Sequence, residues 1–307
     1  MPTLSGWLEY SARSGEWLSI ASGFAWAVGI ILFRISGRKV TPIGLNVFKN
    51  LIALFLIIPT VLLLRQEFDP DLPPRVLPLF LLSGVLGIAI SDTLFLAALN
   101  KLGAGLLAIV DCLYSPFVII LSFIFLGERM TAWQIIGALL VVSAVLTVSK
   151  AGGDNGGPKS RKELVSGMII GILAMVLVAI SIILVKPYLG MVSTSWATMA
   201  RLTGGLAALF IFLPFYKGRR AALKPLFKLN NWKVMIPAAF FGTYLSLVLW
   251  MGGMKYTQAS IAAVLNQLNV VFTVILAVLF LKERMTRWKI LAVVLALAGA
   301  WLAAGKF

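Results

Sequence analysis

Four charged side chains lie within long apolar stretches of the sequence, where a charge is costly: Lys49, Asp92, Asp111 and Arg201. On membrane-insertion scales, a charge near the centre of a helix costs about 2.5–3.5 kcal/mol. Each of these residues therefore needs a partner, a water-filled cavity or a role in function. A carboxylate can take up a proton or bind an ammonium group, and an Arg or Lys can bind a carboxylate. These residue types suit a cavity that binds a small charged molecule.

Two sets of polar residues at helical spacing accompany the charges: Asn46, Lys49 and Asn50, and Asp111, Tyr114 and Ser115. Each set falls at positions i, i+3 and i+4, so it forms one polar stripe on an otherwise apolar helix. At 1.5 Å per residue, Lys49, Asp92 and Asp111 lie at a similar depth, about 10 Å into a membrane. The three charges can therefore meet if their helices face one another.

Two interpretations of these residues stay open. In the first, Lys49 pairs with Asp92 or Asp111, Arg201 binds amides and backbone carbonyls, and the network only holds helices together. In the second, which the sequence slightly favours, the groups face a cavity. There Asp111 accepts a proton or binds an ammonium, because two carboxylates beside one lysine titrate as a coupled set. Arg201 or Lys49 then recognises a carboxylate.

Apolar stretches of roughly 20 residues recur along the whole chain, and about 20 helical residues cross a hydrocarbon core of about 30 Å. Of the 307 residues, 60% are hydrophobic and 12% are charged. We predict an all-α polytopic membrane protein of the cell membrane, because lipid offers no partner for an open strand edge. The ten predicted spans are 16–34, 41–64, 76–98, 104–126, 131–149, 164–185, 193–216, 232–252, 256–281 and 287–304.

The composition argues against several other classes of protein. The formal charge of +16 does not indicate nucleic-acid binding, because the cations lie between apolar spans. The absence of histidine argues against a metal centre and against Ser-His catalysis. No Walker A motif is present, and we expect no cofactor and no enzymatic activity. A membrane-embedded enzyme acting on lipid-linked substrates stays as a weak alternative, because the two aspartates lie on different helices.

The chain contains an internal duplication. The segment FLGERMTAW at 125–133 returns as FLKERMTRW at 280–288, and GIILFR at 29–34 returns as SIILVK at 181–186. The first offset of 155 residues pairs the polar positions of the two halves: Asn46 with Arg201, Asp111 with Asn266, Cys112 with Gln267, and Tyr114 with Asn269. One half is therefore acidic with a lysine, and the other is rich in amides with an arginine.

Each half contains five spans, an odd number, so the second half must enter the membrane from the opposite side. We predict two inverted repeats, at 1–150 and 164–307, joined by a flexible Gly-rich and charged connector at 151–163. Inverted repeats form a cavity at their interface that opens to either side, which is typical of secondary transporters. Glu128, Arg129, Glu283 and Arg284 lie at span ends, and we expect them to fix the turns there.

The five-plus-five spans, the GER and KER turns and the small-residue segment ALNKLGAGLLA at 98–108 resemble the EamA-type branch of the drug/metabolite transporter superfamily. The resemblance implies ten helices, with spans 5 and 10 at the periphery, that move small metabolites, often outward. We therefore predict a secondary transporter for a small polar or zwitterionic metabolite, such as an amino acid. It would work by alternating access, with proton coupling or exchange. A structural or regulatory membrane subunit without transport is the alternative, and a homodimer stays open.

Loop charges and the resemblance disagree about orientation. The loops after spans 1, 3, 5, 7 and 9, counted together with the span ends beside them, hold 18 Lys and Arg residues, and the opposite face holds seven. The positive-inside rule therefore predicts both termini outside the cell. The resemblance implies both termini in the cytoplasm.

Overall fold

The computed structural model describes residues 4–63, 72–129, 131–148 and 160–304, and all regular elements in these ranges are helical. The first half contains α1 (Leu4–Ser36), α2 (Pro42–Leu63), α3 (Val76–Gly84), η1 (Val85–Ser91), α4 (Asp92–Leu102), α5 (Ala104–Asp111), α6 (Tyr114–Leu126) and α7 (Ala132–Val148). The second half begins with α8 (Arg161–Val185), η2 (Lys186–Met191), α9 (Thr194–Phe212), η3 (Leu213–Phe215), α10 (Arg219–Leu223) and η4 (Lys224–Phe227). It ends with α11 (Leu229–Ala239), η5 (Phe240–Leu245), α12 (Ser246–Tyr256), α13 (Ala259–Asn266), α14 (Asn269–Leu281) and α15 (Arg287–Ala304).

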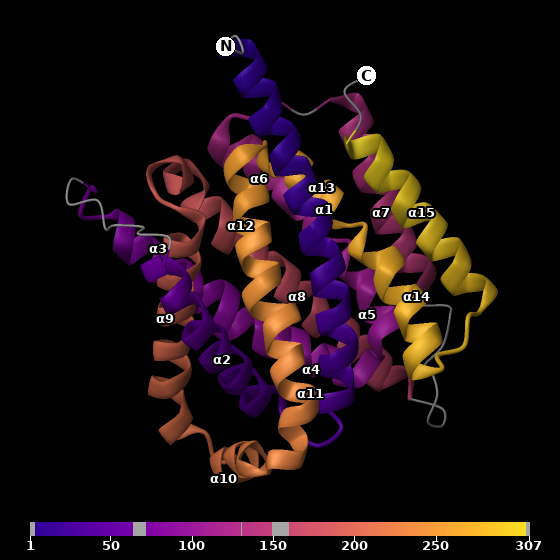
Figure 1. The fold of residues 1–307 in the computed structure, drawn as a ribbon. Coiled ribbons are helices and arrows are strands. Elements are labelled where there is room, and N and C mark those ends of the chain that lie inside the picture. The colour runs from indigo at the N-terminus through magenta and orange to yellow at the C-terminus, as the bar shows by residue number, and fades with distance from the viewer. Residues whose placement is uncertain (1–3, 64–71, 130, 149–159, 305–307) are drawn as a thin grey trace.

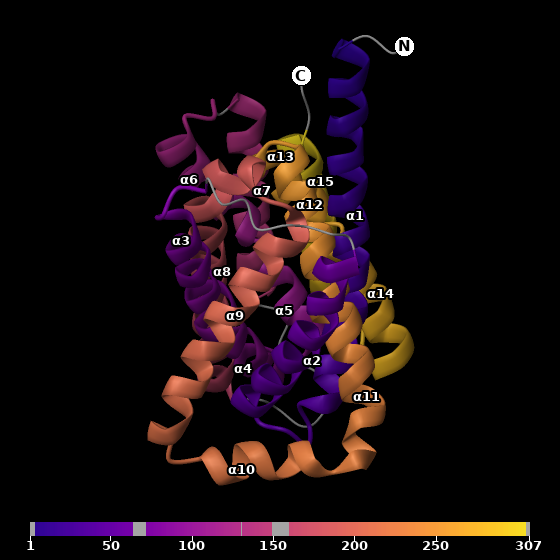
Figure 2. The ribbon, with the colours of Figure 1, turned by 60° about the vertical axis from the view of Figure 1, so that its left-hand side comes forward.

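Eight helical segments of the described residues are long and apolar enough to cross a membrane: Ser14–Ser36, Pro42–Leu63, Val76–Leu102, Ala104–Leu126, Arg161–Met191, Thr194–Phe215, Leu229–Tyr256 and Ala259–Leu281. The chain is therefore an all-helical, multi-pass membrane protein. Two shorter apolar helices, within α7 and α15, pack against each other at one edge of the bundle (Figure 1). Both termini lie at one end of the bundle, and α10 lies at the other (Figure 2).

Two of the predicted spans are broken near their middle. The span expected at 104–126 consists of α5 and α6, and the span expected at 256–281 consists of α13 and α14. At each break the backbone tightens into i→i−3 hydrogen bonds, such as Leu113 N–H to the Val110 carbonyl and Leu268 N–H to the Leu265 carbonyl. Pro116 contributes to the first break, because proline lacks an N–H for the carbonyl four residues earlier. The second half has Val271 at that position, so proline does not explain its break.

Two further spans contain a π-helical turn, again at equivalent positions. η1 lies between α3 and α4, and η5 lies between α11 and α12, 155 residues later. A π-helical turn inserted in an α-helix is rare and frequently marks a functional site. These two insertions, which apolar periodicity does not reveal, indicate where to look for the site.

The two halves exchange their first helices. α1 of the first half packs against η5, α12 and α14, whereas α8 of the second half packs against η1, α4 and α6. Small residues allow the close approach: a Cβ atom on Gly29 would lie 2.2 Å from the Gly242 Cα, and one on Gly87 would lie 2.5 Å from the Ser181 Oγ. Each half therefore completes its core with a helix from the other.

The repeated GER and KER turns form reciprocal contacts between the halves, which we call the glutamate caps. Ala104 and Gly105 at the start of α5 donate their N–H groups to the Glu283 carboxylate, at 2.9 and 3.0 Å. At the opposite end, Ala259 and Ser260 at the start of α13 donate to Glu128, and the Ser260 hydroxyl adds a bond of 2.8 Å. A carboxylate suits the positive end of a helix. The caps also show that α5–α6 and α13–α14 run antiparallel.

A residue with a left-handed backbone conformation precedes each of the two capping glutamates. Gly127 has a φ of 66° and Lys282, its equivalent, has a φ of 55°. The next N–H group, of Glu128 or Glu283, bonds back to the carbonyl six residues earlier, at Ser122 or Ala277, and so satisfies one of the last carbonyls of the helix. The glutamates thus do more than fix their own turns, which is all that the sequence predicted for them.

Next to each capped helix start, a cation from the same half binds the end of the preceding helix. Arg34 donates to the carbonyls of Leu99 and Asn100, where α4 ends, at 3.0 Å each. Lys186, the repeat equivalent of Arg34, donates to the carbonyls of Met254 and Thr257, where α12 ends. Positive groups suit the negative ends of helices. The duplicated GIILFR and SIILVK segments therefore end on equivalent cations with equivalent contacts.

The connector expected at 151–163 lies mostly outside the described residues. Its last residues are helical, because α8 begins at Arg161. Ser160 provides the N-cap of this helix by accepting a hydrogen bond from the Glu163 N–H. The boundaries of the two repeats, at 1–150 and 164–307, stay a prediction.

Candidate functional site

A cavity of about 90 Å³ lies in the middle of the bundle, where the two π-helical turns and the two helix breaks converge. Both halves line it: Ser22, Trp26, Lys49, Gly87, Ile88, Ser91, Asp92, Phe95, Asp111, Tyr114, Met175, Val178, Arg201, Gly242, Thr243, Ser246, Leu247, Trp250 and Asn266. One buried water needs about 10–15 Å³ of such space. The cavity therefore holds on the order of six to nine water-sized groups, which suits a small metabolite.

Lys49 and Asp92 form an ion pair in the cavity wall. The Lys49 Nζ lies 2.5 Å from the Asp92 Oδ2 and also donates to the Asn50 Oδ1 at 3.3 Å. The Lys49 side chain is 2% exposed and that of Asp92 is 19% exposed. Of the two partners that the sequence left open for Lys49, the structure brings Asp92 to it. The charges of this pair cancel.

Asn46 and Asn50 surround the pair but do not line the cavity. Asn46 donates to the carbonyls of Ile88 and Ala89, at 2.8 and 3.3 Å, and to the Thr93 Oγ1 at 2.9 Å. A π-helical turn disturbs the regular backbone ladder, so these bonds satisfy carbonyls in η1. Asn50 donates to the Asn46 side chain and backbone. The polar stripe on α2 faces inward, as its spacing predicts.

Arg201 carries a positive charge that no described carboxylate neutralises within ion-pair distance. Its Nη1 donates to the Ser83 Oγ at 2.6 Å, and its Nη2 donates to the Ser181 Oγ at 3.3 Å. Both serine hydroxyls donate their own protons to backbone carbonyls. The guanidinium lies 5.2 Å from the centre of the Trp250 ring, and its Nε has no partner. Neutral groups hold this cation in place and leave its charge available.

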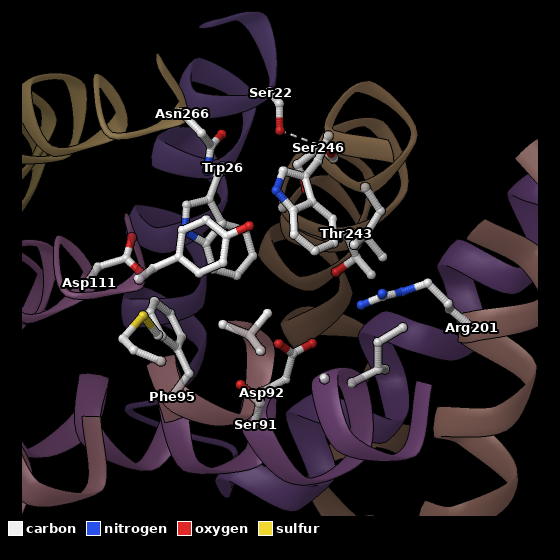
Figure 3. A pocket seen from close by; sticks show the side chains of 18 of the residues that line it. Ser22, Trp26, Ser91, Asp92, Phe95, Asp111, Arg201, Thr243, Ser246 and Asn266 are labelled. Carbon is white, nitrogen blue, oxygen red and sulfur yellow. Dashed lines mark hydrogen bonds between the residues drawn. The ribbon is translucent and has the colours of Figure 1, made fainter. Parts of the chain in front are cut away.

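Asp111 lies on the opposite side of the cavity from Arg201, and Asp92 lies between them (Figure 3). Asn269 Nδ2 donates to the Asp111 Oδ2 at 3.2 Å, and Gln267 Nε2 donates to the Asp111 backbone carbonyl at 3.4 Å. No described cation lies within ion-pair distance of this carboxylate. The amides of the second half therefore surround the acidic residue of the first half.

The remaining predicted residues separate into two groups. Tyr114 and Asn266 line the cavity, and the Tyr114 hydroxyl has no hydrogen-bond partner. Gln267 and Asn269 do not line the cavity and instead donate hydrogen bonds to Asp111. The four intramembrane charges thus share one cavity, but only Lys49 and Asp92 pair with each other.

Sequence reasoning missed Trp26, Phe95 and Trp250, which form the aromatic part of the wall together with Tyr114. Trp26 and Phe95 lie with ring centres 5.2 Å apart, and Tyr114 lies 6.2 Å from Trp250. An aromatic residue within an apolar span carries no distinguishing pattern. Trp26 could have been found only through the repeat. It lies three residues before the repeated GIILFR segment, and its equivalent in the second half, Val178, lines the same cavity.

The cavity suits reversible binding of a polar molecule. It presents one unpaired cation, one unpaired carboxylate and several hydroxyl and amide groups within aromatic walls. Among the described residues, no group of three or more His, Cys, Asp or Glu is arranged to hold a metal ion.

Comparisons with known proteins identify relatives of both halves. A sequence model described as the EamA-like transporter family matches the chain twice, over residues 13–150 and 165–305. The chain is also 28% identical over 138 residues to an uncharacterized transporter from Methanothermobacter thermautotrophicus. That similarity covers 45% of this chain and 40% of the relative.

A solved structure supports the fold. A crystal structure of another protein matches 95% of this chain and 96% of its own chain, with a TM-score of 0.68 and 18% sequence identity. At this identity the similarity concerns the fold alone.

Proposed function

Because the chain belongs to the EamA-like transporter family, we propose that its cavity carries a small polar or zwitterionic metabolite, such as an amino acid, across the membrane. The protein is a membrane transporter by family.

The proposed mechanism is alternating access by two inverted five-helix repeats with ten spans in total. The family model matches the chain twice, and the two halves exchange equivalent helices, α1 and α8. α7 and α15 would provide the fifth span of each half, in line with their position at the edge of the bundle. A cavity between such repeats can open to either face as one repeat rocks against the other.

A zwitterion is the cargo that best fits the charges of the cavity. The observation that carries this proposal is the contrast between one neutralised pair, Lys49–Asp92, and two uncompensated charges, on Arg201 and Asp111. In this arrangement Arg201 binds the carboxylate of the cargo, because a guanidinium matches a carboxylate with two parallel hydrogen bonds. Asp111 meets the ammonium group or takes up a proton.

We further propose that transport is coupled to protons or to exchange and that it runs outward. A carboxylate in the cavity wall supports proton coupling or exchange, and export follows from family analogy. Tyr114 and Asn266 would contact the cargo, whereas Asn46, Asn50, Gln267 and Asn269 would hold the charged residues in place. The partners are then the cargo and the bilayer, with no nucleic acid and with a homodimer open.

The test is a thermal-stability screen of the purified, detergent-solubilised protein against a metabolite library. A ligand at 100 times its Kd stabilises a protein by about 2.7 kcal/mol, so a specific cargo raises the Tm measurably. We expect amino-acid-like zwitterions to raise it in the wild type and to lose this effect in Arg201→Gln. Arg220→Gln, an exposed arginine of α10, is the matched control. No stabilising metabolite in the wild type would favour the subunit without transport.

A further inference from the structure

Four side-chain oxygens without a hydrogen-bond partner are buried beside the break between α13 and α14: those of Asn266, Gln267, Asn269 and Thr273. Gln267 is 2% exposed, Asn269 is 1% exposed and Thr273 is fully buried. An unpaired buried polar group is unfavourable, so each such group calls for an explanation. A cluster of acceptors in one place indicates that something fills it.

Two residues of the cluster contact Asp111, one at its carboxylate and one at its backbone carbonyl. Asn269 and Gln267 bond to Asp111 through their NH₂ groups. A half-turn of a terminal amide exchanges its oxygen and nitrogen at nearly constant position, and the torsion is soft. Thr273 lies one turn after Asn269 on α14, and its Cβ leans back toward Asn269. These residues can therefore present oxygens where they now present N–H groups.

Two helices also end here. α5 ends at Asp111 and α13 ends at Asn266, and α6 and α14 begin three residues later, at Tyr114 and Asn269. The opposite ends of the helix dipoles therefore offset each other at each break. The negative charge of the region comes from the Asp111 carboxylate, and no described cation neutralises it.

We propose that Asp111, Asn269, Gln267 and Thr273 form a binding site for one Na⁺ ion at the crossing of the two broken spans. One proton on Asp111 would satisfy a single acceptor, whereas a cation satisfies several oxygens at once. Hard cations take oxygen ligands from carboxylates, amides and hydroxyls. A single carboxylate matches a single positive charge, which favours a monovalent ion over Ca²⁺ or Mg²⁺. The ends of interrupted helices are where transporters bind such ions.

The site would make Na⁺, in place of a proton, the coupling ion, and this role rests on the proposed transport function. Asp111 lines the cavity, whereas Asn269, Gln267 and Thr273 do not. The ion would therefore lie behind the cavity wall and share Asp111 with it. Occupancy by Na⁺ changes the charge that the cargo meets, so the two ligands affect each other's affinity by the same factor.

The test measures Na⁺ binding by the purified protein without any metabolite. The Tm is recorded in increasing NaCl, with choline chloride keeping the ionic strength and pH constant. We expect a saturable rise with Na⁺, and equilibrium dialysis with ²²Na⁺ should give one ion per chain. Equal Tm values in NaCl and choline chloride, with or without a dependence on pH, would overturn the proposal.

Two variants localise the ion. Asp111→Asn should abolish the Na⁺-dependent rise, and Thr273→Val should weaken the apparent Na⁺ affinity about tenfold or more. Thr273→Val removes an unpaired buried hydroxyl, so its Tm in choline chloride should equal or exceed that of the wild type. Ser36→Ala removes another unpaired buried hydroxyl, at the end of α1, and should keep the full Na⁺ response. An unchanged Na⁺ response in both Asp111→Asn and Thr273→Val would place the ion elsewhere and overturn this site.

The same preparations separate this proposal from the transport function. Metabolites that stabilise the wild type in choline chloride would support the cargo cavity even if Na⁺ has no effect. A Na⁺ effect without any metabolite effect would support the ion site and leave the cargo proposal without support.

Discussion

Arg201 keeps its charge because the groups that hold it are neutral. Ser83 and Ser181 accept from the guanidinium, and Trp250 lies beside it, so the side chain is positioned without being neutralised. A lysine at this position would keep the charge but lose the two-pronged geometry that matches a carboxylate. The geometry and the charge can therefore be tested separately.

We predict that Arg201→Lys lowers transport at low cargo concentration by about tenfold to a hundredfold, equivalent to about 1.4–2.8 kcal/mol. The measurement is the initial rate of uptake of the cargo into proteoliposomes. Arg220→Lys, at an exposed residue of α10, should transport like the wild type. Unchanged transport by Arg201→Lys would show that charge alone suffices.

The Lys49–Asp92 pair stabilises the fold, and a double-mutant cycle on the free energy of unfolding tests this role. Removing one partner of a buried pair costs about 3–5 kcal/mol, because it leaves the other charge uncompensated. We expect Asp92→Asn to destabilise strongly and the double variant Lys49→Met/Asp92→Leu to regain most of the loss. The free energy of unfolding in mixed micelles is the measurement. Additive losses in the double variant would contradict an ion pair.

The four intramembrane charges, Lys49, Asp92, Asp111 and Arg201, could be singled out from the sequence because burial of a charge is costly wherever it occurs. The spacing of Asn46, Lys49 and Asn50 was enough to place them on one inward face. The partner of Lys49 could not be predicted from the sequence, because Asp92 and Asp111 were both expected at its depth. The choice of Asp92 depends on how α2 and α4 meet, which is a property of packing.

At the scale of elements, the glutamate caps explain why the chain repeats the GER and KER turns. Each cap satisfies two backbone N–H groups at the start of a helix in the other half. The repeated cations, Arg34 and Lys186, satisfy carbonyls at the ends of the preceding helices. The same corner is thus built twice, once near each end of the bundle.

We predict that Glu283→Ala lowers the free energy of unfolding by about 1–3 kcal/mol, because it leaves two buried N–H groups without an acceptor. Glu128→Ala should have a similar effect. Glu163→Ala, an exposed glutamate in the first turn of α8, is the control and should change stability by less than about 0.5 kcal/mol. Equal effects of Glu283→Ala and Glu163→Ala would contradict the caps.

The interruptions of the helices were beyond sequence reasoning. Hydropathy averages over many residues, so it detected continuous spans at 104–126 and 256–281 and missed both breaks. Only Pro116 pointed to one of them, and Val271 shows that proline is not required. The π-helical turns have no composition of their own, yet they place Gly87 and Gly242 at the cavity.

At the scale of the whole molecule, the duplication was readable because its offset is nearly constant. The exchange of α1 and α8 between the halves was not, because repeats can pack in several ways with the same sequence identity. Because the first helices are exchanged, both halves line the same cavity.

Orientation is a property of the whole molecule that a single experiment decides. In a Cys112→Ser background, Lys224→Cys near α10 gives one cysteine at the end of the bundle opposite the termini. The loop charges predict that this cysteine faces the cytoplasm and that an impermeant maleimide labels it only in broken cells. Labelling in intact cells would place the termini in the cytoplasm, as the family resemblance implies.

The most direct test of transport through this cavity is solute counterflow in proteoliposomes with a metabolite found in the stability screen. Liposomes preloaded with the unlabelled metabolite should transiently accumulate the labelled form through the wild-type protein. Arg201→Lys should accumulate it about tenfold or more slowly. Equal accumulation by wild type, Arg201→Lys and protein-free liposomes would contradict transport through this cavity.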